Sequence, residues 1–324
     1  MASQAVIAQA PVKKKTTQIG DIVARWTVLV FAASLLAITG LLVYELWIGS
    51  AAARSALGFG FLTSSEWNPV TDKFGALPFI YGTVVTSFLA LLISVPLGVG
   101  AAMFLSELAP AGISNALTFV IELLAAIPSV IYGLLAIFTV VPLMRTTVEP
   151  FLKHTLGLLP YIGALFRGPA YGVGYLTAGM VLAIMTIPFV ISVSRESLLA
   201  VPREQREAAL ALGATRWETT WQVVMPWAKL GIFGSVFLGL ARALGETMAV
   251  TMVIGNDPSI HASLLAPGYS IAAVIANEFS EAGGAIYPAA LIELGLVLFF
   301  LTIVINAAAR IMIMATTSKG SKRV

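Results

Sequence analysis

The chain has 324 residues and a formal net charge of +3, and it is 58% apolar with only 11% charged residues. Because soluble domains carry about a quarter charged residues, this composition excludes an ordinary soluble protein and favours a polytopic membrane protein. The small positive charge requires no nucleic-acid partner. The lack of cysteine excludes disulfides, thiolate chemistry and cysteine metal sites.

Apolar stretches long enough to cross a bilayer recur along the chain, since a membrane-spanning helix needs about 20 apolar residues. We predict an all-α fold with six transmembrane helices at residues 27–48, 78–105, 116–144, 173–194, 230–256 and 288–313. The run 155–166 is about half a bilayer long, and we predict a re-entrant or interfacial segment there. The domain organisation follows as a tail at 1–26, a transmembrane domain at 27–313 with outer inserts at 49–77 and 145–172, a cytoplasmic loop at 195–229, and a tail at 314–324.

The distribution of basic residues predicts the orientation, because cytoplasmic loops carry an excess of Lys and Arg. With the N-terminus inside, the inner segments carry thirteen basic residues, Lys13 to Lys15 among them, and the outer segments carry five. Both termini and the loop 195–229 are therefore expected in the cytoplasm. A basic start followed by an apolar run also fits a signal peptide, with small residues at 51–53 for cleavage. The length of the run favours a retained helix instead.

The third predicted span holds an acidic residue and a helix-breaking pair. Glu122 precedes Pro128 and Ser129, which can interrupt a helix and expose its backbone to a cavity. A gate role for these three residues is one interpretation. A protonated or hydrogen-bonded acid between helices is the other.

The loop 195–229 has the pattern of a short helical hairpin. Pro202 stands where a first helical residue belongs, and Gly213 where a left-handed helix cap belongs. Thr215 and Glu218 have the spacing of a capping box, so a second helix is expected to start there and to stop at Pro226. Trp217, Trp221 and Val224 are predicted to share one face of this second helix.

The motif of this loop consists of Glu207-Ala208-Ala209, three residues, Gly213, nine residues and Val223-Val224-Met225-Pro226. It resembles the cytoplasmic EAA loop of bacterial ABC importer permeases, with Val for Ile and Met for Leu as mild departures. The resemblance implies the type I importer permease fold, and it implies that the loop contains the coupling helix that docks on an ATPase subunit. The alternative is a surface hairpin that only links two spans.

Two opposite charges lie in the fifth predicted span. Arg242 and Glu246 are four residues apart, so on one helix they would share a face and could form an ion pair. Charges at bilayer depth are costly unless they face protein or water. Arg242 would supply the bidentate donors that suit a passing oxyanion, with Glu246 holding it in place. A permanent structural salt bridge is the alternative.

Further segments narrow the resemblance. The runs Arg242–Asn256, Trp67-Asn68-Pro69 and Glu122–Ser129, with Tyr132-Gly133, are similar to the PstC-type permeases of phosphate importers. The resemblance implies a translocation pathway at Arg242 and Glu246 and transport of inorganic phosphate by alternating access. It also implies three partners: a PstA-type second permease, a PstB-type ATPase dimer and a PstS-type periplasmic phosphate-binding protein.

The chain has no Gly-rich loop ending in Gly-Lys-Ser or Gly-Lys-Thr, so a separate ATPase subunit is expected to use ATP and Mg. We expect neither a catalytic site nor a cofactor in this chain. His154 and His261 lack metal-ligand spacing, so no metal site is expected. The outer loop 257–287 has no Lys or Arg, which favours contact with the binding protein.

Three alternatives remain open. The same machine could carry phosphonate, sulfate or molybdate, since Arg242 suits each of these oxyanions. A secondary anion transporter would also place charges in a span, although it needs no docking loop and no inverted repeat is found. A membrane scaffold or sensor would leave the buried charges unexplained.

Overall fold

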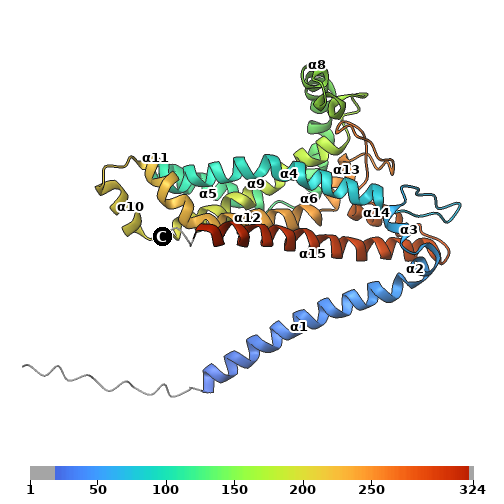
Figure 1. The fold of residues 1–324 in the computed structure, drawn as a ribbon, viewed down its shortest axis with the longest axis horizontal. Helices are drawn as coiled ribbons and strands as arrows, with labels where there is room; N and C mark the ends of the chain where they lie inside the picture. Colours follow the sequence, from blue (N-terminus) through green and yellow to red (C-terminus); the bar gives the residue numbers. More distant parts are fainter. Residues whose placement is uncertain (1–18, 321–324) are drawn as a thin grey trace, which may run out of the picture. The chain divides into compact units, whose positions relative to one another are not determined.

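The computed structural model describes residues 19–320 and divides into two units, Met1–Ile48 and Gly49–Val324 (Figure 1). The described part of the first unit lies within the helix α1 (Ile19–Gly49). Its apolar window is entirely exposed within the chain, and its length is ample for a membrane span. Most of the predicted tail 1–26, with Lys13 to Lys15, lies outside the described residues, as do residues 321–324.

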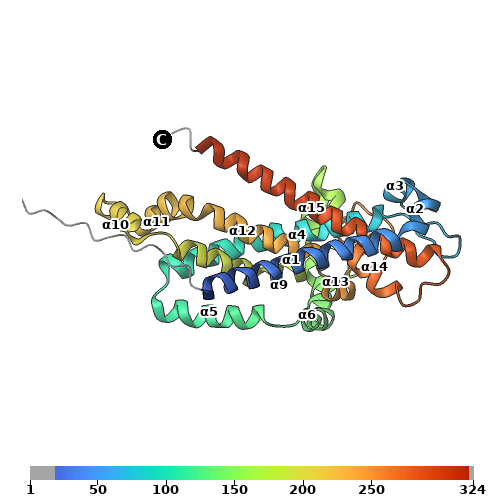
Figure 2. The same cartoon turned by 90° about the horizontal axis from the view of Figure 1, so that it is seen from below.

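Three long helices of the second unit run alongside one another (Figures 1 and 2): α4 (Leu77–Met103), α9 (Tyr175–Leu199) and α12 (Met225–Leu244). A fourth, α15 (Ile286–Gly320), contacts α12 and diverges from it toward its C-terminal end in Figure 2. Helix α9 is the central one, because 61% of its apolar window is buried, against 33% or less in the other long apolar helices. It packs against α4 and α12 and also against the shorter α5 (Ala111–Ala125).

Small residues allow these helices to approach closely. A Cβ atom at Gly179 would meet the Leu89 side chain at 2.6 Å, and one at Gly98 would meet Val190 at 2.7 Å. Between α9 and α12 the hydroxyl oxygens of Ser194 and Ser235 are 2.8 Å apart and form a buried hydrogen bond. Van der Waals contact and such polar links replace the hydrophobic drive between helices in a membrane.

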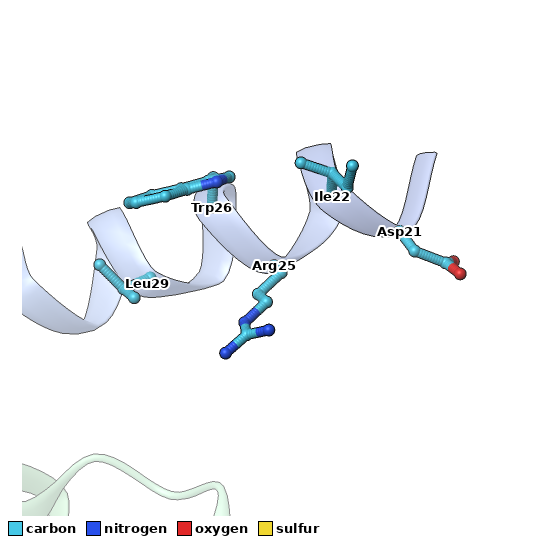
Figure 3. Close-up of a pocket in the computed structure, with 5 residues that line it drawn as sticks. All are labelled: Asp21, Ile22, Arg25, Trp26 and Leu29. Atoms are coloured by element: carbon cyan, nitrogen blue, oxygen red, sulfur yellow. The ribbon is translucent and has the colours of Figure 1, made fainter. Parts of the chain in front are cut away.

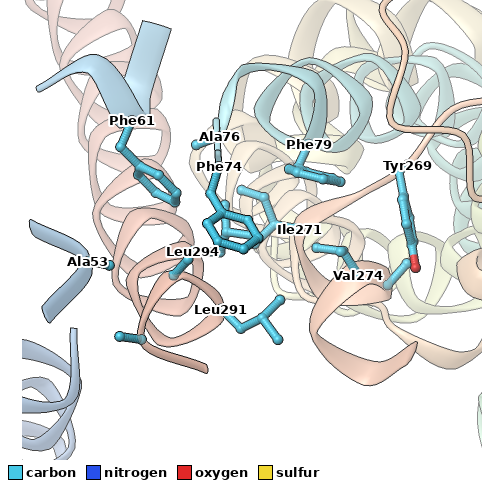
Figure 4. Packing of buried hydrophobic residues seen from close by; sticks show 13 residues of the cluster. Ala53, Phe61, Phe74, Ala76, Phe79, Tyr269, Ile271, Val274, Leu291 and Leu294 are labelled. Carbon is cyan, nitrogen blue, oxygen red and sulfur yellow. The ribbon is translucent and has the colours of Figure 1, made fainter. Parts of the chain in front are cut away.

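The first outer insert (49–77) and the segment around α14 fold onto the end of this bundle opposite the helix α10 (Arg203–Ala211), and they build an aromatic core there (Figure 4). It includes residues from α2 (Ala51–Leu57), α3 (Gly60–Thr63), α14 (Ile271–Glu278) and the ends of α4 and α15. Trp67 packs edge-on against Phe74 and Phe79, at centroid distances of 4.9 and 4.7 Å. Its indole N–H donates to Glu278 Oε2 at 2.9 Å, which fixes the first outer insert to α14.

The prediction of one continuous span at 116–144 is wrong. Helix α5 ends at Ala125, and α6 (Ser129–Leu135) begins after Pro128, whose ring disfavours a helical conformation at the preceding residue. From Ser129 the chain stays helical through two π-helical turns to Thr155, in α8 (Glu149–Thr155), and ends in a 3₁₀ turn at Leu156–Leu158. This helical run crosses the direction of the bundle, and α8 stands away from it in Figure 1. The predicted segment 155–166 contains only the end of this run and a second 3₁₀ turn, Ile162–Phe166.

Six helices of the described chain are long and apolar enough to cross a membrane, as the sequence predicts: Gly20–Gly49, Leu77–Leu108, Ser129–Leu158, Tyr175–Leu199, Arg216–Leu244 and Ile286–Ile311. The described residues are otherwise helices, turns and loops, with two isolated bridges in place of any strand. The all-α membrane fold is therefore confirmed, and the third and fifth spans differ from their predicted bounds.

Candidate functional site

The hairpin that carries the motif begins with α10 (Arg203–Ala211), and Pro202 is its N-cap, one residue before the predicted position. The helix ends in a Schellman turn: Gly213 N–H donates to Leu210 O at 3.0 Å and Ala214 N–H to Ala209 O at 3.2 Å. Gly213 has a φ of +91°, so the left-handed cap predicted there is confirmed. Glu207 and Ala208 are exposed and Ala209 is half-buried.

The second half of the hairpin begins with α11 (Arg216–Thr219). The capping box is present: Thr215 Oγ1 accepts from Glu218 N–H at 3.2 Å, and Glu218 Oε2 accepts from Thr215 N–H at 2.8 Å. The predicted stop at Pro226 is wrong, because a π-helical turn at Thr220–Val224 leads directly into α12. The wider turn precedes the proline, where an α-helix would bring its ring against the carbonyl four residues back.

The aromatic face of this segment is split by the same turn. Trp217 and Trp221 stack with centroids 6.1 Å apart and are both more than half exposed. Val224 is fully buried, so the prediction that it shares a face with the tryptophans is wrong. A π-helical turn has more residues than an α-turn, which shifts the faces that follow it.

Arg242 and Glu246 do not share a helix. Helix α12 ends at Leu244, and Gly245 closes it with a hydrogen bond to Ala241 O at 3.3 Å. Glu246 Oε1 instead accepts from the N–H of Ala249 at 3.3 Å, in the first turn of α13 (Met248–Val253). The prediction of an i,i+4 ion pair therefore fails, because Gly245 ends the helix and the Glu246 carboxylate binds the backbone at the start of the next one. Arg242 is exposed, and it has no ion-pair partner among the residues that the structure describes.

Two helix breaks lie near this arginine. The break at Pro128 leads into α6, which packs tightly on α13: a Cβ atom at Gly133 would meet the Met252 sulfur at 2.5 Å. From α6, Tyr132 donates to Leu124 O at 2.8 Å across the first break, and it interacts electrostatically with Arg242 near the second. The structure therefore places Arg242 within electrostatic reach of Tyr132, which follows the Pro128–Ser129 break, and broken helices of this kind line the binding sites of transporters.

Glu122 lies apart from this cluster. It is exposed on α5 and lines a small hollow of about 20 Å³ with Thr118, Arg195 and Glu196. The Arg195 Nε and Thr118 Oγ1 atoms there are buried without a hydrogen-bond partner among the described residues. The structure thus separates Glu122, beside α9, from Pro128 and Ser129, beside α13.

A tight ion pair was missed by the sequence reasoning. The Arg206 guanidinium donates to Glu107 through Nη2 at 2.8 Å and Nε at 3.1 Å, and both side chains are mostly buried. Glu107 belongs to a π-helical turn, Phe104–Leu108, that continues α4. The two residues are 99 positions apart, so no local sequence pattern predicts the contact.

Two further surface hollows lie outside these residues. The outer one, about 450 Å³, is lined by residues that include Arg167, Asp257 and His261. Burial by itself would raise the pKa of Asp257, but hydrogen bonds from Ser259 and His261 lower it below its usual value. The other is on α1, where Asp21, Ile22, Arg25, Trp26 and Leu29 come from a single helix with no second wall (Figure 3). No described cluster of acidic and histidine residues has the size of a metal site.

The chain is similar to known transport proteins. The family model described as "Binding-protein-dependent transport system inner membrane component" matches residues 94–315. The phosphate transport system permease protein PstC of Mesorhizobium japonicum is 50% identical over 283 residues, which cover 87% of this chain and 86% of that protein. The protein of the same name from Pasteurella multocida is 44% identical and covers 97% of this chain, with 98% of its own length matched.

Solved structures agree on the fold. A chain of a bacterial alginate ABC transporter matches with a TM-score of 0.58 at 20% identity, covering 91% of this chain and 96% of that one. A chain of the MetNI methionine ABC transporter, in an inward-facing conformation, matches with a TM-score of 0.55 at 17% identity, covering 73% and 94%. At such identities the likeness shows an ABC importer permease fold and nothing about cargo.

Proposed function

Because the chain belongs to the family of binding-protein-dependent transport system inner membrane components, we propose that it is the permease subunit of an ABC importer for inorganic phosphate. It is a multi-pass inner-membrane protein and a transport subunit, with ATP hydrolysis on a separate chain. The observation that carries phosphate as the cargo is the 44–50% identity to phosphate permeases over most of both chains.

The residues near the helix breaks form the proposed pathway. Arg242 lies in the last turn of α12, exposed within this chain and free of an ion-pair partner among the described residues. Because its guanidinium is not engaged by a carboxylate of the described chain, it would offer paired N–H donors to phosphate oxygens. Glu246 accepts a hydrogen bond from the Ala249 N–H in the first turn of α13, and it would fix the backbone of the second break beside the arginine. Pro128 and Ser129 would act with Tyr132 at the facing break, and Glu122 would act as a separate gate beside α9.

The hairpin forms the proposed coupling site. Glu207, Ala208, Ala209 and Gly213 present an exposed helix and a fixed turn to an ATPase subunit, and Pro226 lies where the hairpin joins α12. ATP and Mg would be used there, on the partner, with no cofactor bound by this chain. In alternating access, closure of the ATPase dimer would displace the hairpin and turn the spans outward. Both termini would lie in the cytoplasm with the hairpin.

The remaining partners follow from the same proposal. A second, PstA-type permease would complete the pathway beside Arg242, and PstB-type subunits would form the ATPase dimer. A PstS-type periplasmic protein would deliver phosphate to the outer inserts and the loop 257–287. Tyr269 of that loop is buried in the core beneath this surface, and burial raises its pKa to about 12 despite a hydrogen bond from Asn277.

The test is uptake of labelled phosphate into vesicles that contain this chain with the three partner types, with sulfate, molybdate and phosphonate as competitors. We expect uptake that requires ATP and the binding protein and that resists all three competitors. Inhibition by one competitor would mean that the ABC importer carries that anion, with the rest of the proposal unchanged. Uptake without ATP would contradict the importer and favour a secondary transporter.

A further inference from the structure

Arg206 is the most fully engaged charged side chain of the coupling hairpin. Its Nη2 and Nε atoms bind both carboxylate oxygens of Glu107, at 2.8 and 3.1 Å. Nη2 also donates to Leu198 O at 2.7 Å, and Nη1 donates to Val201 O. One guanidinium therefore joins three elements: α10, the π-helical turn that continues α4, and the C-terminal end of α9.

The rest of α10 is only lightly attached. None of its residues is buried, and no other ion pair joins the hairpin to the bundle among the residues that the structure describes. Arg206 is 19% exposed and Glu107 10%, so water screens this pair less than it screens a surface pair. Fork-to-fork geometry fixes direction as well as distance. The contact can therefore transmit displacement in a way that loose packing cannot.

The elements that the pair joins are those that must move. Helices α4 and α9 form the most extensive helix pair of the bundle, and α9 is its centre. The carbonyl groups of Leu198 and Val201 lie at the end of α9, where the helix dipole favours a cation. Glu107 lies in a π-helical turn, a local irregularity often found at functional positions.

The motif residue lies beside the pair. Glu207 lines a hollow of about 360 Å³ together with Glu107, Arg206, Arg203, Ser106 and Leu199. A segment of the ATPase that contacts Glu207 would therefore meet the surface of α10 directly above the ion pair. Movement of the ATPase against Glu207 would act directly on Arg206, because the two residues are adjacent in the chain.

We propose that Arg206 and Glu107 form a joint that transmits movement of the coupling hairpin to α4 and α9, in addition to the motif residues that bind the ATPase. The inference rests on the proposed function, because a transmitted movement requires an ATPase partner. The two residues act as positioning residues and contact neither ATP nor cargo. Breaking the joint is expected to separate ATP hydrolysis from transport and to leave docking intact.

The experiment uses the complete assembly in vesicles, with the variant Glu107→Gln. The amide removes the charge and one acceptor, and it leaves Arg206 bound to the two carbonyl groups. We expect normal co-purification of the ATPase subunit and a fall of about tenfold in phosphate imported per ATP hydrolysed. Arg206→Lys should do the same, since an ammonium lacks the planar fork. Asp21→Asn removes an exposed carboxylate from α1 and serves as the matched control, with unchanged uptake.

A second readout does not depend on the cargo. Because the chain has no cysteine, spin labels can be placed at Leu97→Cys on α4 and Leu238→Cys on α12, both exposed positions. ATP should change the distance between the labels, and Glu107→Gln should abolish that change. If phosphate uptake is absent but this result holds, the cargo is wrong and the joint stands. Unchanged import per ATP, loss of ATPase binding, or a distance that does not respond to Glu107→Gln would overturn the joint.

Discussion

At the scale of single residues, glycine contacts decide where α4 tolerates a side chain. A Cβ atom at Gly82 would lie 2.0 Å from the carbonyl oxygen of Tyr269, which is backbone and cannot swing away. We expect Gly82→Ala to destabilise the protein by about 1–3 kcal/mol, because the outer loop must shift away from α4. Thermal unfolding of the detergent-solubilised chain measures this loss.

Gly100 on the same helix is the control. No atom lies within 4 Å of a Cβ built there, so Gly100→Ala should gain helix propensity. The midpoint temperature of thermal unfolding should then rise slightly. If both variants unfold at the temperature of the unmodified chain, the close approach of Tyr269 to α4 is not present in solution.

Local chemistry made several residues predictable. Gly213 and the Thr215–Glu218 box act within a few positions of the chain, so their turn and cap can be inferred from spacing alone. Arg206 and Glu107 could not be paired in this way, because the fold brings them together from different hairpins and spans. The i,i+4 spacing of Arg242 and Glu246 predicted an ion pair wrongly, because Gly245 ends the helix between them.

At the scale of elements, the turn at Gly213 sets the angle between α10 and α11. A Cβ atom there would meet nothing within 4 Å, so Gly213→Ala is strained only by its φ of +91°. We expect the free energy that stabilises the turn to fall by about 1 kcal/mol, so that the end of α10 opens more often. Amide hydrogen exchange at residues 210–215 should then accelerate by about fivefold, with the bundle unchanged.

The matched control for that variant is Gly112→Ala. Its Cβ atom also meets open space, but its φ is not positive, so the substitution should not accelerate exchange. Equal exchange in the two variants would mean that conformation at Gly213 does not hold the hairpin.

Prolines show why element boundaries were only partly predictable. Pro128 separates two helices inside the stretch predicted as one span, whereas the helix that was expected to stop at Pro226 continues through it because a π-helical turn precedes it. Both prolines lack the N–H group, so the difference lies in whether the preceding backbone can form a wider turn that accommodates the proline ring. That adjustment depends on packing around Val224 and α12, which single-sequence patterns do not contain.

At the scale of the whole molecule, hydropathy gave the number of long apolar helices but not how they are arranged. Apolar length is a property of the chain, and it yields six candidate spans. The crossing of Ser129–Thr155 over the bundle and the aromatic core of the first outer insert depend on contacts between distant segments. Neither has a periodic signal in the sequence.

Transport itself provides the prediction at this scale. Arg242→Gln removes a charge that has no ion-pair partner among the described residues and lies at a helix break. We expect phosphate uptake to fall by about ten- to a hundredfold as a charged hydrogen bond to phosphate is lost. Assembly with the ATPase should persist, which co-purification measures. Arg310→Gln, an exposed arginine on α15, is the control and should leave uptake intact. Undiminished uptake by Arg242→Gln would reduce Arg242 to a structural role.

The π-helical turn at Thr220–Val224 has a consequence for insertions and deletions. Such a turn is one surplus residue inside an otherwise regular helix. Deleting a residue there would close the wide turn and leave the two ends of the helix in nearly the same directions, whereas deleting one from the regular turns of α12 would rotate everything on the far side by about 100°, the angle of one residue at 3.6 per turn. The tryptophans and the motif would then face a different direction from the same membrane anchor. A change as small as one codon could therefore redirect the surface that this permease offers to its motor without altering a single side chain of that surface.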